Sequence, residues 1–349
     1  MIKLLASKLI NSSVHLVGNK NNDERLILTK KPIDLQNEEL SSILNRFFTD
    51  QFNGKEELFK FSHGSDLALN EIFSHATDIF DNPNSFHFNS VKIANFLYEK
   101  TLHPKIKSGE LYLGYLKDCI VEGDVVDAIC IFKCESKTTF LTVEQEGNEL
   151  NVSYNLSGVN IEKTDKACII FNVNKDNGYK VCLTDNTNKS GDTQYWKEAF
   201  LHVENIENSY HQTDSMIGFY KNFINEEFTN KGSFSSTDKI ALINRSIDYF
   251  KQEDVFQIDD FSKKVLQKPQ LIDSFKSFRE KPTNDSFKIE NEFSISNTAF
   301  KKQSRKLKSV LKLDDNFHIY IHGDKELIEQ GVDEKTGRKF YKIYYDMEK

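Results

Sequence analysis

Six short strand-type segments between residues 110 and 184 constrain the fold of this chain more than any other feature. They are Glu110–Leu116, Val125–Lys133, Thr138–Val143, Leu150–Tyr154, Ala167–Val173 and Tyr179–Leu183. Two turns join neighbouring segments into hairpins, Glu146-Gly147-Asn148-Glu149 and Asp176-Asn177-Gly178. Asn-Gly is a strong hairpin signal because both central residues of the turn need a positive φ. Hairpins in series predict an antiparallel sheet, and therefore an α+β fold and not a doubly wound one.

Segments with helical periodicity surround these strands. Asp34 is expected to cap a helix whose apolar side chains form one stripe, namely Leu40, Ile43, Leu44, Phe47 and Phe48. Two more helices are expected before Pro104, and two short strands, Val14–Val17 and Arg25–Thr29, before the first helix. Helical spacing returns after residue 194, with a break expected near Pro269.

The chain is long enough for about two domains. We expect an α+β domain with the antiparallel sheet over residues 1–205 and a helical region over 206–283. A last part, 284–349, is expected to hold a basic segment and a C-terminal β-hairpin. The turn Glu334-Lys335-Thr336-Gly337 before the aromatic strand Phe340–Tyr345 predicts that hairpin.

The cysteines and the N-terminus bear on the compartment. The number of cysteines is odd, and no two of them form a Cys-x-x-Cys pair. They lie at positions 119, 130, 134, 168 and 182. Such cysteines fit buried, reduced thiols in a cytoplasmic protein better than disulfides or a zinc site. The apolar start Met1–Ile10 is interrupted by Lys8 and is too short for a signal peptide, and no stretch approaches a membrane span.

The common enzyme signatures are absent from the sequence. There is no Gly-x-Gly, no P-loop, no His-Glu-x-x-His and no Gly-x-Ser-x-Gly, so none of these motifs predicts a catalytic site, and we expect no cofactor. One alternative stays open: Asp127, Glu135 and Lys137 resemble the carboxylates and lysine of a metal-dependent nuclease. His318 and His322 share a face of an extended segment, but no third ligand completes a metal site, so we expect none.

A cluster of basic residues is the most informative functional signal. Six cations fall within twelve residues with no acid between them: Lys301, Lys302, Arg305, Lys306, Lys308 and Lys312. On a helix, the spacing of 301, 305, 308 and 312 would form one cationic ridge that binds phosphates; the alternative is an ordinary solvated face. Arg338 and Lys339 would extend this patch if the last hairpin folds beside it.

The charge balance and the types of cation refine this prediction. The net charge is −7, yet residues 231–349 alone carry +3, which leaves −10 on the rest. The cations are 40 Lys and only 6 Arg. Lysine suits phosphate contacts, whereas bidentate reading of bases favours arginine, so DNA binding without strong sequence preference is expected. Trp196 could stack on bases, but a role in the core is favoured.

Several apolar and aromatic segments carry a family resemblance. They are Tyr195-Trp196-Lys197-Glu198-Ala199-Phe200-Leu201, Tyr210-His211-Gln212-Thr213, Phe219-Tyr220-Lys221-Asn222-Phe223, the helical segment Leu35–Phe52 and the closing segment Leu311–Tyr320. In order and spacing these segments resemble the NdpA/YejK-type bacterial nucleoid-associated proteins over nearly the whole chain. The resemblance implies a cytoplasmic protein of the bacterial nucleoid that binds DNA and has no enzymatic activity. It assigns no DNA contact to any residue.

The sequence therefore predicts a protein that binds DNA, expected to be double-stranded, through the C-terminal basic residues. A homodimer would raise the effective concentration of such a site, and protein partners of the nucleoid are a further option. Recruitment to the nucleoid by another protein is the first alternative function, and the metal-dependent nuclease is the second.

Overall fold

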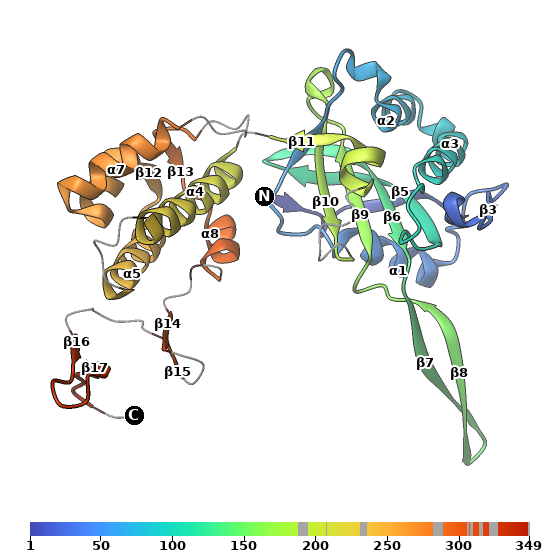
Figure 1. Ribbon diagram of the computed structural model, residues 1–349. Coiled ribbons are helices and arrows are strands. Elements are labelled where there is room, and N and C mark those ends of the chain that lie inside the picture. The colour runs from blue at the N-terminus through green and yellow to red at the C-terminus, as the bar shows by residue number, and fades with distance from the viewer. Residues whose placement is uncertain are drawn as a thin grey trace. The chain divides into compact units, whose positions relative to one another are not determined.

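The computed structural model describes two compact units of the chain, Met1–Ile206 and Glu207–Lys349 (Figure 1). The described residues are 1–187, 195–206, 208–230, 236–281, 289–305, 307, 310–313, 317–320 and 327–347. Both helices and antiparallel strands are abundant in these ranges, which confirms the predicted α+β class. No helix in these ranges combines the length and the apolar character that crossing a membrane requires.

A nine-stranded antiparallel sheet forms the centre of the first unit, counted over the described residues. The strand order is β11-β4-β10-β9-β6-β5-β2-β3, and β1 pairs with β5. The strands are β1 (Ile2–Lys3), β2 (Lys8–Val17), β3 (Leu26–Ile27), β4 (Phe59–Phe61), β5 (Gly109–Val121), β6 (Asp124–Cys134), β9 (Lys166–Phe171), β10 (Lys180–Asp185) and β11 (Val203–Asn205).

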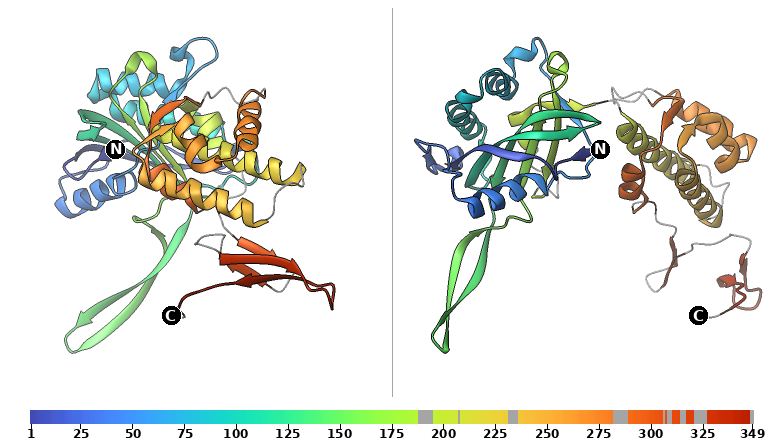
Figure 2. Two further views of the ribbon diagram at one scale, coloured as in Figure 1. Left: turned by 90° about the vertical axis from the view of Figure 1, so that its left-hand side faces the viewer. Right: turned by 180° about the vertical axis from the view of Figure 1, so that it is seen from behind.

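Helices cover both faces of this sheet (Figure 2). On one face lie α2 (Glu71–Asp81), α3 (Phe86–Glu99) and a π-helical segment, Tyr195–Leu201; on the other lies α1 (Glu38–Thr49). Because successive side chains of a strand point to opposite faces, Ile129 and Ile131 of β6 pack with α2 and α3, while Cys130 and Phe132 pack with α1. Burial on both faces explains why the central strands read as continuous apolar runs.

Short 3₁₀ turns and the helix caps complete the first unit. The 3₁₀ turns are Lys20–Asn22, Leu67–Leu69, Pro83–Ser85 and Lys175–Asn177. The predicted cap of α1 is wrong by three residues: Asn37, not Asp34, accepts the backbone N–H of Leu40. The Asp34 side chain instead accepts the N–H of Gln36 and shapes the approach to the helix. The predicted stripe is also narrower, because Leu40 and Ile43 are exposed.

The two predicted hairpins exist, with differences from the expectation. The β9–β10 connection is a longer loop than a two-residue Asn-Gly turn, and its positive φ values lie at Asn174, Gly178 and Tyr179. A Cβ on Gly178 would lie 2.3 Å from the carbonyl oxygen of Phe61, so this close approach requires glycine. The other hairpin, β7 (Lys137–Glu146) with β8 (Glu149–Val159), is not part of the main sheet.

The β7–β8 hairpin stands apart because β6 pairs directly with β9. Its two strands form a separate two-stranded sheet that extends away from the body of the first unit (Figures 1 and 2). The prediction of one sheet containing all six segments is therefore wrong for this hairpin. We call residues 137–159 the arm.

The second unit is a helical core with small β-elements at its C-terminal end. Its elements are α4 (Ser209–Asn230), α5 (Ser236–Gln252), β12 (Val255–Gln257), α6 (Ile258–Phe261), a π-helical segment (Ser262–Leu266), α7 (Pro269–Arg279), β13 (Glu292–Ser294), α8 (Asn297–Ser304), β14 (Val310–Leu313), β15 (Phe317–Tyr320), β16 (Ile328–Val332) and β17 (Lys339–Ile343). The expected break near Pro269 is present, since Gln267 adopts φ 62° before α7 begins.

Aromatic side chains fill the core of the second unit. Tyr220 packs edge-on against Phe261, with ring centroids 5.0 Å apart, and Phe223 packs similarly against Phe275. Phe293 of β13 and Phe300 of α8 belong to the same core, so residues 292–304 pack with the helices that precede them. The predicted division into 1–205, 206–283 and 284–349 stays a prediction.

Candidate nucleic-acid interface

Helix α8 positions the first residues of the basic cluster. The Ser296 side chain caps the helix by accepting the N–H of Ala299, and the Ser296 N–H donates to the Thr213 hydroxyl on α4, 3.0 Å away. Ala299, Phe300 and Gln303 form the buried face of α8, and the Gln303 amide donates to the Asp214 carboxylate of α4. This packing against α4 determines which side chains of α8 face solvent.

Lys301 and Arg305 lie on the exposed face of α8. Both are exposed, and Arg305 occupies the C-cap position immediately after the helix. Residues four apart on a helix lie about 5–6 Å apart at Cβ, so the two cations are neighbours. Cations at a helix C-terminus also interact favourably with the helix dipole, which gives this pair a stabilising role besides any ligand.

Lys302 faces a different direction and contributes to packing. Its ammonium donates a hydrogen bond to the Tyr210 hydroxyl of α4, 2.8 Å away, and lies 5.4 Å from the centroid of the Tyr210 ring. A lysine held over an aromatic ring in this way stabilises the contact between two helices. Lys302 is itself exposed, but of the predicted phosphate-binding residues on α8 it is the one whose ammonium binds a side chain of the protein.

The single cationic ridge considered for residues 301–312 does not form. Helix α8 ends at Ser304, and Lys312 lies on strand β14, opposite His318 of β15. Lys306 and Lys308 lie outside the described residues. Among the described residues, the helical spacing of the cluster therefore applies to Lys301 and Arg305, whereas Lys312 lies on a strand.

Arg338 and Lys339 lie where the C-terminal hairpin begins its last strand. Asp333 shapes the preceding turn, since its carboxylate accepts the N–H groups of Lys335 and Thr336, at 2.9 and 2.8 Å. These hydrogen bonds from the turn hold the pKa of Asp333 below its usual range. Arg338 and Lys339 are both exposed. Ile240 of α5 anchors the small sheets at this end of the unit, because Ile319, Ile328 and Tyr341 pack against it.

The residues of the nuclease alternative are not brought together. Asp127 and Glu135 are eight residues apart along β6 and its end, which is about 26 Å in extended backbone. The Tyr115 hydroxyl donates to Asp127, 2.6 Å away, whereas Lys137 forms an ion pair with Glu110. In the part of the chain that the structure describes, no group of three or more His, Cys, Asp or Glu could hold a metal ion.

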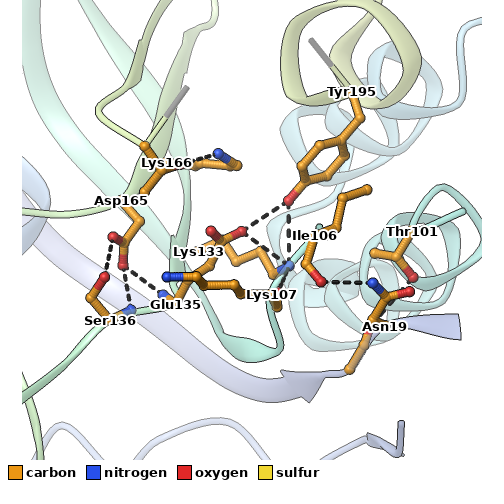
Figure 3. Close-up of polar contacts among 12 residues, drawn as sticks. Asn19, Thr101, Ile106, Lys107, Lys133, Glu135, Ser136, Asp165, Lys166 and Tyr195 are labelled. Carbon is orange, nitrogen blue, oxygen red and sulfur yellow. Dashed lines mark hydrogen bonds and ion pairs between the residues drawn. The ribbon is translucent and has the colours of Figure 1, made fainter. Parts of the chain in front are cut away.

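Glu135 instead belongs to a buried polar cluster with Lys133 and Tyr195 (Figure 3). The Lys133 ammonium lies 3.3 Å from the Glu135 carboxylate, and it donates to the Lys107 carbonyl at 2.7 Å and to the Tyr195 hydroxyl at 3.3 Å. The Tyr195 hydroxyl donates to Glu135 at 3.1 Å. Burial lowers the pKa of Lys133, while burial and then Glu135 raise the pKa of Tyr195. Because each N–H of the ammonium has a partner, this cluster stabilises the fold.

Asp165 binds the backbone where the arm leaves the sheet (Figure 3). Its carboxylate accepts the N–H of Glu135 at 2.6 Å and of Ser136 at 2.7 Å, and the Ser136 hydroxyl donates to it at 2.7 Å. These three hydrogen bonds join the start of the arm to the residue immediately before β9. The root of the arm is thereby fixed to the main sheet.

The remaining residues considered from sequence do not form a site. Trp196 is fully buried against Phe200, with ring centroids 4.9 Å apart, so it is not available to stack on bases. His318 is exposed on β15, and His322 lies outside the described residues. All five cysteines are buried, and burial raises the pKa of Cys119 and of Cys134 to about 12.

Sequence reasoning missed two features of these regions. Nothing in the sequence pairs Lys302 with Tyr210, which lies 92 residues earlier. The apolar alternation at Leu150, Val152, Tyr154 and Leu156 was visible and indicated a strand with one apolar face. The missing information was that this face lies outside the main sheet.

Comparison with known proteins identifies a family. A family model described as nucleoid-associated protein YejK matches residues 13–347. The match spans both units, including α8 and the C-terminal hairpin. The search of curated proteins found no match.

Proposed function

This chain belongs to the family of nucleoid-associated protein YejK, and from that membership we propose that it associates with the bacterial nucleoid by binding DNA directly. Contact is made by the basic residues of 301–312, with Arg338 and Lys339 as further contacts. Binding is weak and without strong sequence preference, and the partner is duplex DNA. The protein acts in the cytoplasm, with no cofactor and no catalytic step.

The exposed pair Lys301 and Arg305 is the observation that carries this proposal. The buried face of α8 packs on α4, which directs both cations to solvent, and no acid occurs between residues 301 and 312. A cationic segment with no acid in its own sequence favours a polyanion. The C-terminal dipole of α8 makes some cationic charge expected there, but it does not require six cations in twelve residues.

Charge on the two units supports a local site. The first unit has 22 Lys and Arg against 29 Asp and Glu, whereas the second has 24 of each. The first unit is therefore repelled by a polyanion. The second unit has no net charge, so its binding of DNA depends on the local cluster of cations. Each phosphate that a cation neutralises releases counterions, which lowers log K by about 0.9 per unit of log salt concentration.

Recruitment by another protein is the alternative that the fold still leaves room for, because the arm offers an exposed apolar surface. The nuclease alternative has no comparable support, since Asp127 and Glu135 do not converge. Incubation of the purified protein with plasmid DNA and Mg²⁺ is expected to leave the DNA intact. Cleavage that Glu135→Gln abolishes would overturn the proposal that the protein has no catalytic step.

Localisation of two variants in bacterial cells tests direct binding against recruitment. In the basic-cluster variant all six cations of 301–312 become Gln. In the matched control, six exposed cations of the first unit become Gln: Lys3, Lys8, Arg25, Lys30, Lys31 and Lys117. Both variants replace five lysines and one arginine, so their net charges are equal.

The proposal expects the fluorescent fusion of the basic-cluster variant to spread through the cytoplasm and the control to remain on the nucleoid. Nucleoid localisation of both variants would contradict direct binding by this cluster and favour a protein recruiter. Loss of localisation in both variants would mean that overall charge, and not this segment, determines association.

A further inference from the structure

The arm has one polar and one apolar face. Residues directly opposite in an antiparallel pair point to the same side, and successive residues alternate. The pairs Leu141–Tyr154, Val143–Val152 and Gln145–Leu150 therefore lie on one face, with Leu156 next along β8. The pairs Phe140–Asn155, Thr142–Ser153 and Glu144–Asn151 lie on the other, which is polar apart from Phe140.

The apolar face of the arm is exposed along its whole length. The exposed fractions are 69% for Leu141, 58% for Val143, 68% for Leu150, 65% for Val152, 68% for Tyr154 and 61% for Leu156. None of these side chains belongs to a core cluster among the described residues. A contiguous apolar surface of this kind marks an interaction site, and a two-stranded ribbon is only marginally stable until such a face is covered.

The arm is attached firmly at its root. Asp165 fixes Glu135 and Ser136, and the ion pair of Lys137 with Glu110 ties the first residue of β7 to β5. The arm therefore presents its apolar face in a set direction, which favours a preorganised interface over a loosely tethered ribbon.

The charges of the arm exclude a polyanion as the occupant of this face. Glu144, Glu146 and Glu149 lie at its tip, and the apolar face carries no cation. DNA phosphates and anionic lipid headgroups are repelled by such a tip. An uncharged face of five aliphatic side chains, Tyr154 and Gln145 can pack on an identical face without burying a charge.

The size of the face matches a dimer. On β8 the apolar side chains run from Leu150 to Leu156, and steps of ~3.4 Å per residue make a face roughly 20 Å long. Two such faces in contact remove on the order of 1,000 Å² from water, which reaches the area that a specific interface needs. From charge, area and attachment together, we propose that the apolar face of the arm is a homodimer interface, on which the same face of a second copy packs about a two-fold axis.

The acidic tip determines whether the two arms pack parallel or antiparallel. Parallel arms would place two sets of Glu144, Glu146 and Glu149 side by side, at a cost in repulsion. Antiparallel arms separate the tips and place the two-fold axis near the middle of the face, close to Val143 and Val152. A residue near a two-fold axis meets its own copy in the partner, so Val152 lies near the partner's Val152.

Mass measurements on the full chain test this interface. The wild type is expected to sediment at twice the chain mass of 40.5 kDa. Leu141→Glu with Val152→Glu is expected to weaken the dimer by at least ~100-fold, because charges on this face would be buried. The matched control, Thr142→Glu with Ser153→Glu, adds the same charge at a similar position along the arm but on the opposite face. It is expected to remain dimeric. Neither pair lies in the main core, so both variants are expected to fold.

Single cysteines give a second, independent readout. All five natural cysteines are buried, so little background reaction is expected. Under mild oxidation Val152→Cys is expected to form a covalent dimer, whereas Ser153→Cys on the opposite face remains a single chain. A wild type that sediments at one chain mass at every concentration would overturn the proposal and assign the face to a different partner. A dimer that survives the apolar-face pair of substitutions would also overturn it.

This interface does not depend on the proposed DNA binding, because mass and crosslinking are measured without DNA. If both proposals hold, two basic segments act on one DNA molecule, and the effective concentration of the second raises the overall affinity. Loss of the dimer with DNA binding intact at high concentration would separate the two roles.

Discussion

The Lys302 ammonium donates a hydrogen bond to the Tyr210 hydroxyl, 2.8 Å away, and this contact joins the basic cluster to the core of the second unit. Lys301 and Arg305, on the outer side of the same helix, remain exposed. All three residues are exposed, but they differ in their contacts: the Lys302 ammonium binds Tyr210 of α4, whereas Lys301 and Arg305 lie on the outer side of the helix. The difference can be measured by substituting them separately.

Lys302→Gln is expected to lower the free energy of unfolding of the second unit by about 1–2 kcal/mol, because the hydrogen bond and the contact with the Tyr210 ring are both lost. Lys301→Gln, one residue away and exposed, serves as the control and is expected to change it by less than about 0.5 kcal/mol. Urea unfolding, followed by far-UV circular dichroism, measures the change in free energy of unfolding for both variants. Equal effects of the two substitutions would contradict the assignment.

The pair Lys301→Gln and Arg305→Gln is expected to reduce the salt dependence of DNA binding. Loss of two phosphate contacts lowers the magnitude of the slope of log K against log salt by about 1.8. Lys302→Gln is expected to change this slope less, because its ammonium is directed to Tyr210. Titrations at four salt concentrations measure the slopes; an unchanged slope in the double variant would show that α8 does not contact phosphates.

Asp165→Ala is expected to loosen the root of the arm. Three hydrogen bonds to one carboxylate are lost, and two backbone N–H groups are left without that acceptor, which costs about 2–3 kcal/mol. Limited proteolysis is expected to cleave the variant within the arm faster than the wild type. Glu162→Ala, an exposed carboxylate nearby, is the control. If both variants are cleaved at the wild-type rate, the carboxylate does not hold the arm.

The stability of the first unit is expected to depend on pH through His15. Burial, and then the neighbouring His87, lower the pKa of His15 from 6.5 to about 4. The unfolded chain therefore binds more protons between these values, so the free energy of unfolding falls as the pH falls from 6.5 to about 4. A loss of ~1–3 kcal/mol over this window is expected.

His15→Gln is expected to remove this part of the pH dependence. It also loses the native contacts of the ring with Ser90, at 3.0 Å, and with the N–H of Thr29, at 3.2 Å, so its stability at pH 7.5 is lower from the start. Unfolding in urea at several pH values separates the two effects. A variant whose stability falls with pH as steeply as the wild type would show that other groups cause the loss.

The sequence predicted the strands of the first unit well because burial on two faces leaves a clear pattern. Ile129, Cys130, Ile131 and Phe132 read as a continuous apolar run, and all four are buried. The cap of α1 was misplaced because Asp34 and Asn37 are both good capping residues. Which of the two caps α1 depends on where the chain turns onto the sheet, and no local sequence pattern predicts that position.

The candidate site was predicted less completely, for two physical reasons. A run of cations indicates a phosphate-binding segment whether it is helix or strand, so the end of α8 at Ser304 could not be seen in the charge pattern. The pairing of β6 with β9 is non-local, and this pairing leaves the arm outside the sheet. An alternating strand has the same sequence whether a core or a second molecule covers its apolar face.

Fluorescence anisotropy of labelled duplexes tests the central claim most directly. Wild type, the six-Gln variant of 301–312 and the matched six-Gln control of the first unit are titrated at several salt concentrations, on duplexes of unrelated sequence. We expect wild type and control to bind every duplex with similar affinity and a steep salt slope, and the basic-cluster variant to lose both. Absence of binding by the wild type at low salt, or equal binding by all three proteins, would contradict direct DNA binding through this segment.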